Sequence, residues 1–371
     1  MELKEGIMKP SNIVCIGASA GGLEALELFF LNMPSNSNLA FVVVQHLSPD
    51  YKSLMSELLS KKTNMPVLQV QKEVLVQANK VYLIPPGNNL KIHNSKLFLV
   101  PKDKTSLLNL PIDIFMKSLA LDQGEKSIGI ILSGTGSDGM QGIRSIKEAG
   151  GMAMVQDKDT AKFDGMPKSA LSTGLIDFVL PPEDMPEQLI AYLKHPLVSK
   201  QMVAEQILTD EDNLTKIFTI LNKKKNIDFT YYKRSTLMRR IQRRLSVNHI
   251  KDLSEYVQLL TNSDNEVGIL QREFLIGVTN FFRDKEVFQQ LENKYIKNLV
   301  KRKDGGDIRV WVAGCSSGEE AYSIAMLFIE AIEKLKVNVT LKIFATDIDD
   351  NAIFRAGQGI YPESIAADIP S

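Results

Sequence analysis

Hydrophobic positions in the first half of the chain gather in short unbroken runs, with amphipathic stretches of helical period between them. The apolar runs that predict strands are Ile13–Ile16, Leu39–His46, Val81–Ile84, Ile128–Leu132, Met152–Gln156 and Ile176–Leu180. Unbroken apolar runs of this length are typical of parallel strands that are buried on both faces of a sheet. Because they alternate with helical stretches, the pattern predicts an α/β fold with a doubly wound parallel sheet. The turn residues Asn94 and Ser95 predict a surface hairpin.

In the second half of the chain, helical patterns come first and strand patterns come only near the end. Helical stretches cover 214–222, 252–260, 266–275 and 285–301, and apolar strands cover 308–313 and 341–346. This order predicts a small all-α subdomain followed by a Rossmann-like α/β unit. Two strands are fewer than such a sheet normally has, so we expect this unit to be truncated and its open strand edge to promote association or instability.

The composition is that of an ordinary globular protein and argues against a secreted, a membrane-spanning or a zinc-binding protein. The 371 residues predict two or three domains, and the net charge of zero favours neither nucleic acid nor a membrane as partner. No apolar stretch reaches about 18 residues, and the N-terminus lacks the apolar core of a signal peptide. Cys15 and Cys315 are far apart, and no Cys/His cluster has zinc spacing. We therefore expect a cytoplasmic protein without a disulfide, a metal site or a membrane span.

The first apolar run ends in Gly17-Ala18-Ser19-Ala20-Gly21, which matches the pattern G-x-S-x-G. Such a strand–turn–helix holds a serine hydroxyl exposed beside helix N-terminal amides, which can stabilise an oxyanion. A similar turn binds phosphate, but Ser19 replaces the middle glycine of G-x-G-x-x-G, and Leu23 stands where a P-loop has lysine. On this loop alone a nucleophile, an anion-binding turn and a plain turn all stay open.

Two more polar residues, His46 and Asp138, come at or just after the ends of apolar runs. The carboxyl ends of parallel strands share one edge of the sheet, so Ser19, His46 and Asp138 are expected to meet there. Together they supply a nucleophile, a general base and a carboxylate that orients the base, although each alone is more often a solvated or turn residue. His195 is a competing base, but it follows the last helix, and His93 lies in the predicted hairpin. We therefore prefer His46 as the general base.

Four motifs in this half resemble a known family. They are I-G-A-S-A-G-G at 16–22, V-V-Q-H at 43–46, S-G-T-G-S-D-G at 133–139 and F-D-G-M-P at 163–167. With them, residues 11–195 resemble the catalytic domain of chemotaxis protein-glutamate methylesterases, the CheB family. The resemblance implies hydrolysis of glutamyl methyl esters and deamidation of glutamines on chemoreceptors without a cofactor. It implies Ser19, His46 and Asp138 as the catalytic triad and Met166 as a substrate-binding residue.

The chain departs from the CheB pattern in two places. Thr135 stands where the family commonly has methionine, at a position that helps to shape the oxyanion site. Too few residues precede the first strand for the usual N-terminal phospho-receiver domain. We therefore expect that phosphorylation of an aspartate within this chain is not the switch.

Residues 222–251 are strongly basic, with ten Lys and Arg residues against one acid, Asp228. Arg239, Arg240, Arg243 and Arg244 recur at helical spacing and form one broad stripe. A solvated face and a nucleic-acid surface are alternatives, but neither aromatic interleaving nor a groove-binding motif supports nucleic acid. We favour an acidic protein partner, which a basic helix attracts by charge complementarity.

A third glycine-rich turn, Gly314-Cys315-Ser316-Ser317-Gly318-Glu319-Glu320, follows the strand at 308–313 and lacks the lysine of a P-loop. Glu319 near a helix N-terminus suits a cationic ligand, and Asp347 after the next strand can bind ribose hydroxyls. Arg283 is suited to hold a carboxylate in a bidentate pair. These features favour S-adenosylmethionine as ligand over a plain Rossmann-like turn.

The second half also resembles a known family, through T-N-F-F-R-D at 279–284, A-G-C-S-S-G-E-E-A-Y-S at 313–323, A-T-D-I-D at 345–349 and G-I-Y-P at 359–362. Residues 206–371 resemble the chemoreceptor glutamate methyltransferases, the CheR family. The resemblance implies that S-adenosylmethionine contacts Thr279, Arg283, Glu319 and Asp347, with the choice between Glu319 and Glu320 left open. It also implies that the helix with Arg239 and Arg243 recognises receptor methylation helices. A later family motif and the receptor-docking subdomain are absent, so we expect weak transfer or none.

The sequence thus predicts a methylesterase and deamidase fused to a truncated methyltransferase of chemotaxis-type signalling. The predicted parts are a methylesterase domain at 11–195, a linker at 196–205, a helical subdomain at 206–290 and a partial S-adenosylmethionine-binding domain at 291–371. Expected partners are the cytoplasmic methylation helices of chemoreceptors, with a sensor kinase or response regulator, and neither nucleic acid nor an inserted membrane. The alternatives are a non-catalytic receptor-binding scaffold and a serine hydrolase of other ester specificity.

Overall fold

The computed structural model describes residues 8–46, 54–102, 108–195, 210–277, 279–303 and 305–369. The chain divides into unit 1, which comprises Met1–Lys104 and Leu110–Ile276, and unit 2, which comprises Thr105–Asn109 and Gly277–Ser371. The predicted linker at 196–205 lies outside the described residues.

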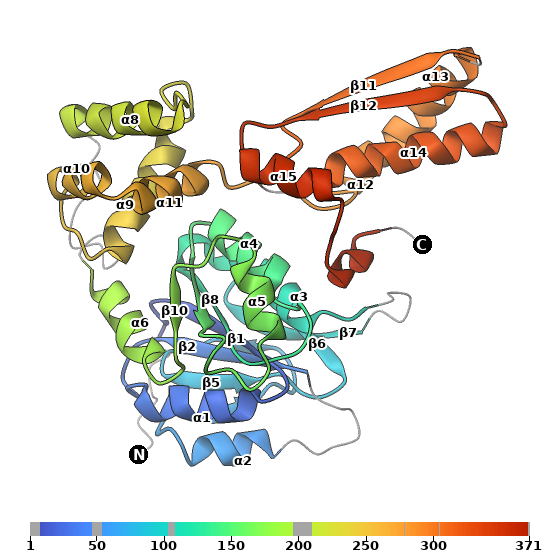
Figure 1. The fold of residues 1–371 in the computed structure, drawn as a ribbon. Coiled ribbons are helices and arrows are strands. Elements are labelled where there is room, and N and C mark those ends of the chain that lie inside the picture. The colour runs from blue at the N-terminus through green and yellow to red at the C-terminus, as the bar shows by residue number, and fades with distance from the viewer. Residues whose placement is uncertain are drawn as a thin grey trace. The chain divides into compact units, whose positions relative to one another are not determined.

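Unit 1 contains a seven-stranded sheet in the order β10-β9-β8-β1-β2-β5-β3, and every neighbouring pair of strands is parallel. The strands are β1 (Ile13–Ala18), β2 (Ala40–Gln45), β3 (Val67–Gln69), β5 (Lys80–Leu83), β8 (Ser127–Ile131), β9 (Met152–Gln156) and β10 (Phe178–Leu180). The predicted doubly wound sheet is confirmed (Figure 1). The strand order reverses at β1, and such sheets bind ligands beyond the strand ends beside the reversal.

Helices cover both faces of this sheet (Figure 1). One face packs against α1 (Gly22–Asn32), α2 (Met55–Ser60) and α6 (Met185–Lys194), and the other packs against α3 (Pro111–Gln123), α4 (Met140–Glu148) and α5 (Gly165–Leu171). Alternate residues of β1 point to opposite faces, so Val14 and Ile16 join one core and Ile13 and Cys15 join the other. Each buried strand is thereby held from both sides.

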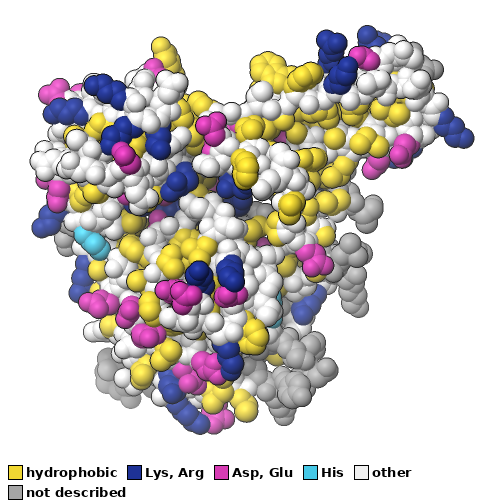
Figure 2. All heavy atoms as spheres, in the orientation of Figure 1, with side chains coloured by type: hydrophobic (Ala, Val, Ile, Leu, Met, Phe, Trp, Pro, Cys, Tyr) yellow, Lys and Arg dark blue, Asp and Glu magenta, His cyan; other side chains and the backbone are white. Residues whose placement is uncertain are grey.

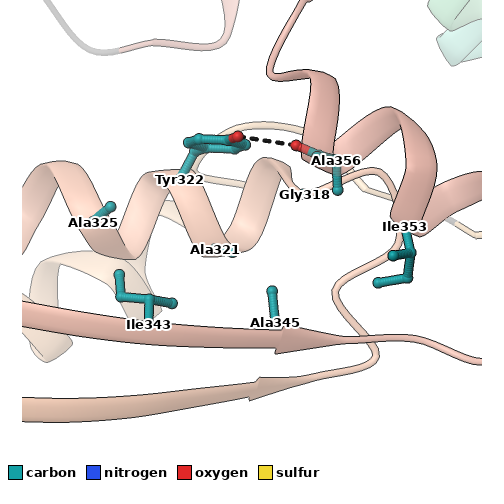
Figure 3. Close-up of a pocket in the computed structure, with 9 residues that line it drawn as sticks. Gly318, Ala321, Tyr322, Ala325, Ile343, Ala345, Ile353 and Ala356 are labelled. Carbon is teal, nitrogen blue, oxygen red and sulfur yellow. Dashed lines mark hydrogen bonds between the residues drawn. The ribbon is translucent and has the colours of Figure 1, made fainter.

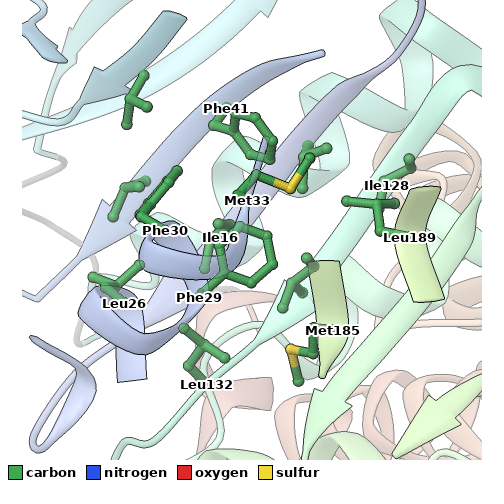
Figure 4. Packing of buried hydrophobic residues seen from close by; sticks show 14 of the residues in the cluster. Ile16, Leu26, Phe29, Phe30, Met33, Phe41, Ile128, Leu132, Met185 and Leu189 are labelled. Carbon is green, nitrogen blue, oxygen red and sulfur yellow. The ribbon is translucent and has the colours of Figure 1, made fainter. Parts of the chain in front are cut away.

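Three phenylalanine rings meet among the aliphatic side chains of the first of these cores (Figure 4). The rings of Phe29 and Phe30 on α1 and of Phe41 on β2 meet edge to face, with centroids 5.2 to 5.9 Å apart. Aromatic pairs prefer this arrangement to a face-to-face stack. The packing fixes α1, and therefore the turn that enters it from β1.

A second sheet of three antiparallel strands lies beside the first and has the order β4-β7-β6. Its strands are β4 (Val74–Leu75), β6 (Asn88–His93) and β7 (Lys96–Pro101). Asn94 and Ser95 join β6 to β7 with φ of 51° and 58°, as a type I′ turn requires, so the predicted hairpin is confirmed. β3 and β4 were not predicted because strands this short carry too little apolar pattern.

The rest of unit 1 is helical and has its own core. Its helices are α8 (Glu211–Lys225), α9 (Arg234–Val247), α10 (Leu253–Asn262) and α11 (Asp264–Phe274). The side chains of Asp210, Asp252 and Ser263 accept backbone N–H groups at the starts of α8, α10 and α11 and so cap these helices. Apolar residues at helical spacing form the core, for example Leu214, Ile217 and Leu221 on α8.

Unit 2 begins with α12 (Lys285–Gln290), a π-helical turn (Leu291–Ile296) and α13 (Lys297–Arg302). A parallel pair of strands follows, β11 (Asp307–Ala313) and β12 (Thr340–Thr346), connected by α14 (Glu319–Leu335). The elements after β12 are α15 (Asp350–Gln358) and a short 3-10 helix (Glu363–Ala367). The described part of this sheet thus has the two strands that the sequence predicts.

The two-stranded sheet of unit 2 is covered on one face and exposed on the other. Ile308 packs in one core with Leu327 and Phe328 of α14. On the opposite face Trp311 and Phe344 are 72% and 55% exposed, and Figure 2 shows hydrophobic side chains at the surface of this part of the chain. Among the described residues, no helix combines the length and the apolar character that crossing a bilayer would take.

Candidate active site

Ser19 lies at the sharp turn between β1 and α1. β1 ends at Ala18, and α1 begins at Gly22 after Gly21, whose φ of 70° is left-handed. A side chain at position 21 would be strained by this φ, and its Cβ would lie 2.7 Å from Lys162 Cβ. The Ser19 N–H donates to the Ser133 carbonyl at 3.0 Å, which fixes the turn to the end of β8.

His46 follows β2 directly and lies between the other two predicted triad residues. Its Nδ1 is 3.3 Å from Ser19 Oγ, and its Nε2 is 2.7 Å from Asp138 Oδ2. The carboxylate accepts the proton of Nε2, which leaves the Nδ1 lone pair directed at the serine hydroxyl. The imidazole is about a third exposed, whereas the Asp138 side chain is buried. This arrangement suits a general base that must meet both substrate and water.

Asp138 is held by three backbone N–H groups. Its carboxylate accepts from Ile112 at 3.0 Å, from Asp113 at 2.9 Å and from Gly139 at 2.9 Å. The first two amides belong to the first turn of α3, where the helix dipole favours a negative charge. The carboxylate is therefore fixed in orientation and stabilised as an anion before it meets His46.

The loop after β8 packs against the serine. A Cβ added to Gly134 would lie 2.9 Å from Ser19 Cβ and 2.2 Å from Met166 Sδ, so only glycine fits between them. The Met166 N–H donates to the Gly134 carbonyl at 2.9 Å, and Met166 itself is buried. Thr135, in contrast, is exposed. The predicted substrate-binding residue Met166 thus lies behind the loop, and its contact with substrate stays a prediction.

The competing histidines lie elsewhere. His195 is buried at the end of α6, and its Nε2 is 3.0 Å from the Ile250 carbonyl oxygen of the helical part. Burial lowers the pKa of this imidazole. His93 is exposed at the end of β6. Neither is placed at the carboxyl edge of the parallel sheet.

The arginines of α9 do not form one surface stripe. Arg239 is exposed, whereas Arg240, Arg243 and Arg244 are buried. The Arg244 guanidinium forms a bidentate pair with Glu266 at 2.7 and 2.8 Å. Their helix packs against other parts of unit 1, so the side chains turn toward buried acids and carbonyls instead of solvent.

A buried ion cluster, which we call the α4–α9 cluster, explains the position of Arg243. The Lys147 ammonium lies 2.8 Å from Asp177 Oδ1 and 2.9 Å from Glu273 Oε1. The Arg243 guanidinium donates to Glu273 at 3.0 Å and also contacts Asp177. Arg240 Nη1 donates to the Lys147 carbonyl at 2.7 Å. Of the two arginines predicted to recognise a receptor, Arg243 therefore has its acidic partners within this chain, and only Arg239 lies at the surface.

In unit 2, two acidic residues lie beyond the ends of neighbouring strands. Glu319 is the first residue of α14 and is buried, and its carboxylate accepts the Ser317 hydroxyl at 2.8 Å. Asp347 follows β12, and its Oδ2 accepts the Ser316 N–H at 2.8 Å. Carboxylates placed in this way suit a ligand that carries a positive charge and hydroxyl groups.

The remaining motifs of unit 2 pack around α14. The Phe282 N–H donates to Ser323 Oγ at 3.1 Å, which holds the segment 279–284 against this helix. The Tyr361 hydroxyl donates to the Ser317 carbonyl at 2.6 Å, and its ring meets Phe281 edge to face. Thr279 is half-buried and Arg283 is exposed. That these two side chains contact S-adenosylmethionine stays a prediction.

An apolar pocket of about 300 Å³ lies between α14, β12 and α15 (Figure 3). Its lining includes Gly318, Tyr322, Ile343, Ala345 and Ile353. The Tyr322 hydroxyl donates to the Ala356 carbonyl at 2.9 Å. The described residues hold no group of three or more His, Cys, Asp or Glu side chains that could bind a metal ion.

Three family models match successive parts of the chain. The CheB methylesterase model matches residues 14–189, the all-alpha domain of CheR methyltransferase matches 212–275, and the SAM-binding domain of CheR methyltransferase matches 277–371. The order of these matches agrees with the two resemblances that the sequence motifs indicate.

Curated relatives match either most of this chain or its first half. An uncharacterized 104.1 kDa protein of Rhodobacter capsulatus is 41% identical over 85% of this chain, which spans only 36% of that protein. A putative protein-glutamate methylesterase/protein-glutamine glutaminase of Leptospira interrogans is 33% identical over 48% of this chain and 92% of its own length. The Thermotoga maritima protein-glutamate methylesterase/protein-glutamine glutaminase is 35% identical over 50% of this chain and 56% of its own length.

A solved structure is also similar in sequence. The CheB methylesterase catalytic domain of Thermotoga maritima is 34% identical and covers 48% of this chain and 97% of its own length, with a TM-score of 0.45.

Proposed function

The chain belongs to the CheB methylesterase family, and we propose that its first domain hydrolyses glutamyl methyl esters of chemoreceptors through Ser19, His46 and Asp138. A CheB methylesterase domain is fused here to CheR methyltransferase domains. The observation that carries the proposal is the position of His46, within hydrogen-bonding distance of both Ser19 Oγ and Asp138 Oδ2. This is the arrangement that acyl transfer by a serine requires.

The reaction proceeds in two acyl-transfer steps. His46 Nδ1 takes the proton from Ser19 Oγ while the oxygen attacks the ester carbonyl carbon. The tetrahedral intermediate then expels methoxide, which leaves as methanol with the proton from the imidazolium. The resulting glutamyl ester of Ser19 is attacked by water, which His46 deprotonates, and glutamate is released as the serine regains its proton. Asp138 stabilises the imidazolium in both steps.

Deamidation of glutamine follows the same course with ammonia in place of methanol. The carbonyl carbon, the nucleophile and the general base are the same, and only the leaving group differs. The domain therefore acts on both a methyl ester and a primary amide of a glutamyl side chain. This substrate class is a proposal that the family relationship supports.

The oxyanion of the intermediate needs N–H donors that the fold has not already used. The Ser19 N–H donates to the Ser133 carbonyl, so it is engaged within the turn. We assign the donor role to the amide of Ala20, which follows the nucleophile at the entrance to α1. The positive end of the α1 helix dipole lies at the same place and also favours the negative charge of the oxyanion.

Unit 2 supplies a binding site for S-adenosylmethionine in this proposal. Glu319 and Asp347 fit the ligand, because one carboxylate can face its positive charge and the other its ribose hydroxyls. Thr279 and Arg283 would complete the set, and Arg283 would pair with the ligand carboxylate. When bound, the ligand supplies a methyl group.

The partners follow from the substrate. The proposed substrate glutamates lie on the cytoplasmic methylation helices of chemoreceptors, which places the chain in the cytoplasm. Arg239 is an exposed arginine of α9 that can meet an acidic segment of such a partner. A sensor kinase or a response regulator of the same signalling system is a further partner in this proposal.

Covalent trapping tests the proposal directly. A fluorophosphonate reacts with serines that a neighbouring histidine activates, and peptide mass spectrometry then identifies the labelled residue. We expect the label on Ser19 in the full chain and its loss in His46→Gln. A label on another serine, or labelling of Ser19 that His46→Gln leaves unchanged, would contradict the assignment.

A further inference from the structure

Two buried aspartates, Asp138 of the proposed triad and the neighbouring Asp113, each accept N–H groups from the start of the helix that the other joins. Asp138, which precedes α4, accepts the N–H groups of Ile112 and Asp113 in the first turn of α3. Asp113, in that same turn of α3, accepts with its side-chain Oδ1 the N–H of Gly142 in the first turn of α4, at 2.6 Å. The two carboxyl groups therefore tie the starts of α3 and α4 together by an exchange of caps.

The two carboxyl groups differ in how many donors surround them. Asp138 receives three N–H groups and the imidazole of His46. Asp113 is 3% exposed, and its Oδ2 is buried without a hydrogen-bond partner in the described part of the chain. An ionised oxygen left in this position would be costly, and it would also repel the neighbouring Asp138. The geometry therefore favours an ionised Asp138 beside a protonated Asp113.

The electrostatic surroundings of Asp113 agree with this assignment. Burial and the nearby Asp138 raise the pKa of the Asp113 carboxyl to about 8, against the lowering effects of the Gly142 N–H and of Lys117 on α3. On the other side of Asp138, Cys15 of β1 is buried, and its thiol pKa is raised by burial and by the same carboxylate. The pKa values of Asp113 and Cys15, the two groups beside the Asp138 carboxylate, are thus both raised.

We propose that Asp113 is a positioning residue of the esterase site, which holds the start of α4 as a neutral carboxylic acid and leaves Asp138 as the single negative charge facing His46. This inference rests on the proposed function, because it assigns Asp113 a role in a reaction that Asp138 and His46 carry out. A protonated acid can fill the cap without competing for the imidazolium. An ionised Asp113 would add a second charge and loosen the junction of α3 and α4.

Two substitutions of Asp113 distinguish its role as a neutral hydrogen-bond acceptor from the effect of a negative charge at this position. Asp113→Asn keeps the size and the carbonyl acceptor for Gly142 N–H but cannot ionise, whereas Asp113→Ala removes the acceptor. Asp122→Asn is the matched control, because Asp122 lies on the same helix and accepts the N–H groups of Asn94 and Ser95 at the hairpin. All are made in the full chain and assayed by methanol release from a methyl-esterified receptor preparation.

We expect Asp113→Asn to keep kcat within about twofold of the wild type near neutral pH, and Asp113→Ala to lower kcat by about tenfold or more with KM little changed. In the wild type, we expect kcat to fall as pH rises through about 8, the value to which the pKa of Asp113 is raised. Asp113→Asn lacks this alkaline decline, and Asp122→Asn retains it. An Asp113→Asn variant as impaired as Asp113→Ala, or one with the wild-type alkaline decline, would overturn the proposal.

Thermal unfolding gives a readout that does not depend on the esterase assay. A carboxyl group whose pKa is higher in the folded than in the unfolded state contributes stability at low pH, and this contribution is lost as pH rises from its ordinary pKa to its folded value. The Tm of Asp113→Asn relative to the wild type should therefore increase between about pH 5 and about pH 8. A constant Tm difference contradicts the neutral acid. Absence of activity in the wild type as well as in every variant, with this Tm trend present, instead contradicts the proposed function.

Discussion

The ammonium group of Lys147 at the end of α4 lies 2.9 Å from the carboxylate of Glu273 on α11, and both side chains are buried. The two residues come from the parallel-sheet part and the helical part of unit 1, and they are 126 positions apart in the chain. Asp177 and Arg243 complete the α4–α9 cluster around them. Buried ion pairs thus join the helical part of unit 1 to its parallel-sheet part.

Removing one charge from this cluster is expected to destabilise unit 1. Glu273→Gln leaves Lys147 and Arg243 with less negative charge in a buried site, and breaking such a pair costs about 3–5 kcal/mol. Urea unfolding of the full chain measures this loss. The matched control is Glu330→Gln, which removes the exposed Lys334–Glu330 pair on α14 and should change stability by less than about 1 kcal/mol. Equal losses in the two variants would contradict a structural role for the cluster.

A methyl group at position 134 is expected to disturb the nucleophile. In Gly134→Ala the new Cβ would lie 2.9 Å from Ser19 Cβ and 2.2 Å from Met166 Sδ, so the serine or the loop must move. Displacement of a reacting group by about 1 Å can lower the rate by about 100-fold. Steady-state kinetics of ester hydrolysis measure kcat. Gly357→Ala in unit 2, where the added Cβ meets nothing within 4 Å, serves as control and should leave kcat unchanged.

Replacement of the triad carboxylate is expected to slow catalysis with little change in fold. Asp138→Asn retains an acceptor for the N–H groups of α3 but presents an amide to His46 Nε2, so the imidazole loses its anionic partner. When the orienting carboxylate is replaced by an amide, the histidine is held in the wrong tautomer, and kcat falls by about 10⁴-fold in hydrolases with such a triad. Kinetics and circular dichroism on the same preparation separate the two effects. A folded Asp138→Asn within about tenfold of wild-type kcat would count against the triad.

Acidification is expected to weaken the contact between α6 and the helical part. His195 is buried against the Ile250 carbonyl, and its lowered pKa means that the unfolded chain binds a proton more readily than the folded one. The contribution to stability is present above the ordinary histidine pKa of about 6.5 and is lost as pH falls through the lower folded value. His195→Asn should therefore have a less steep loss of Tm with falling pH. Parallel slopes for variant and wild type would contradict this.

The sequence was most informative where local pattern and function coincide. Unbroken apolar runs ending in Ser19, at His46 and before Asp138 predict strand ends, and parallel strands leave little choice about where those ends meet. The hairpin turn at Asn94 and Ser95 was equally predictable, because asparagine readily adopts the left-handed φ that such a turn requires. These features depend on neighbours in the sequence, which a pattern can show.

Features that depend on distant contacts were not predictable. Arg243 lies in a basic stretch that resembles a surface face, and its partners Asp177 and Glu273 are specified only when the two parts of unit 1 pack together. Asp113 also escaped notice, because an acid in the first turn of a helix is an ordinary feature of sequences. The signal that could have found Gly134 is its place in the glycine-rich loop beside Asp138, since a loop that approaches another backbone closely needs glycine there.

The central claim is that Ser19 is the nucleophile of an esterase acting on glutamyl methyl esters, and methanol release from a methylated chemoreceptor preparation tests it most directly. Ser37 serves as the matched control, because its side chain accepts the Leu39 N–H away from the strand ends. We predict that Ser37→Ala releases methanol at the wild-type rate, whereas Ser19→Ala falls by about 10⁴-fold or more. Equal rates of methanol release from the two variants would contradict the account.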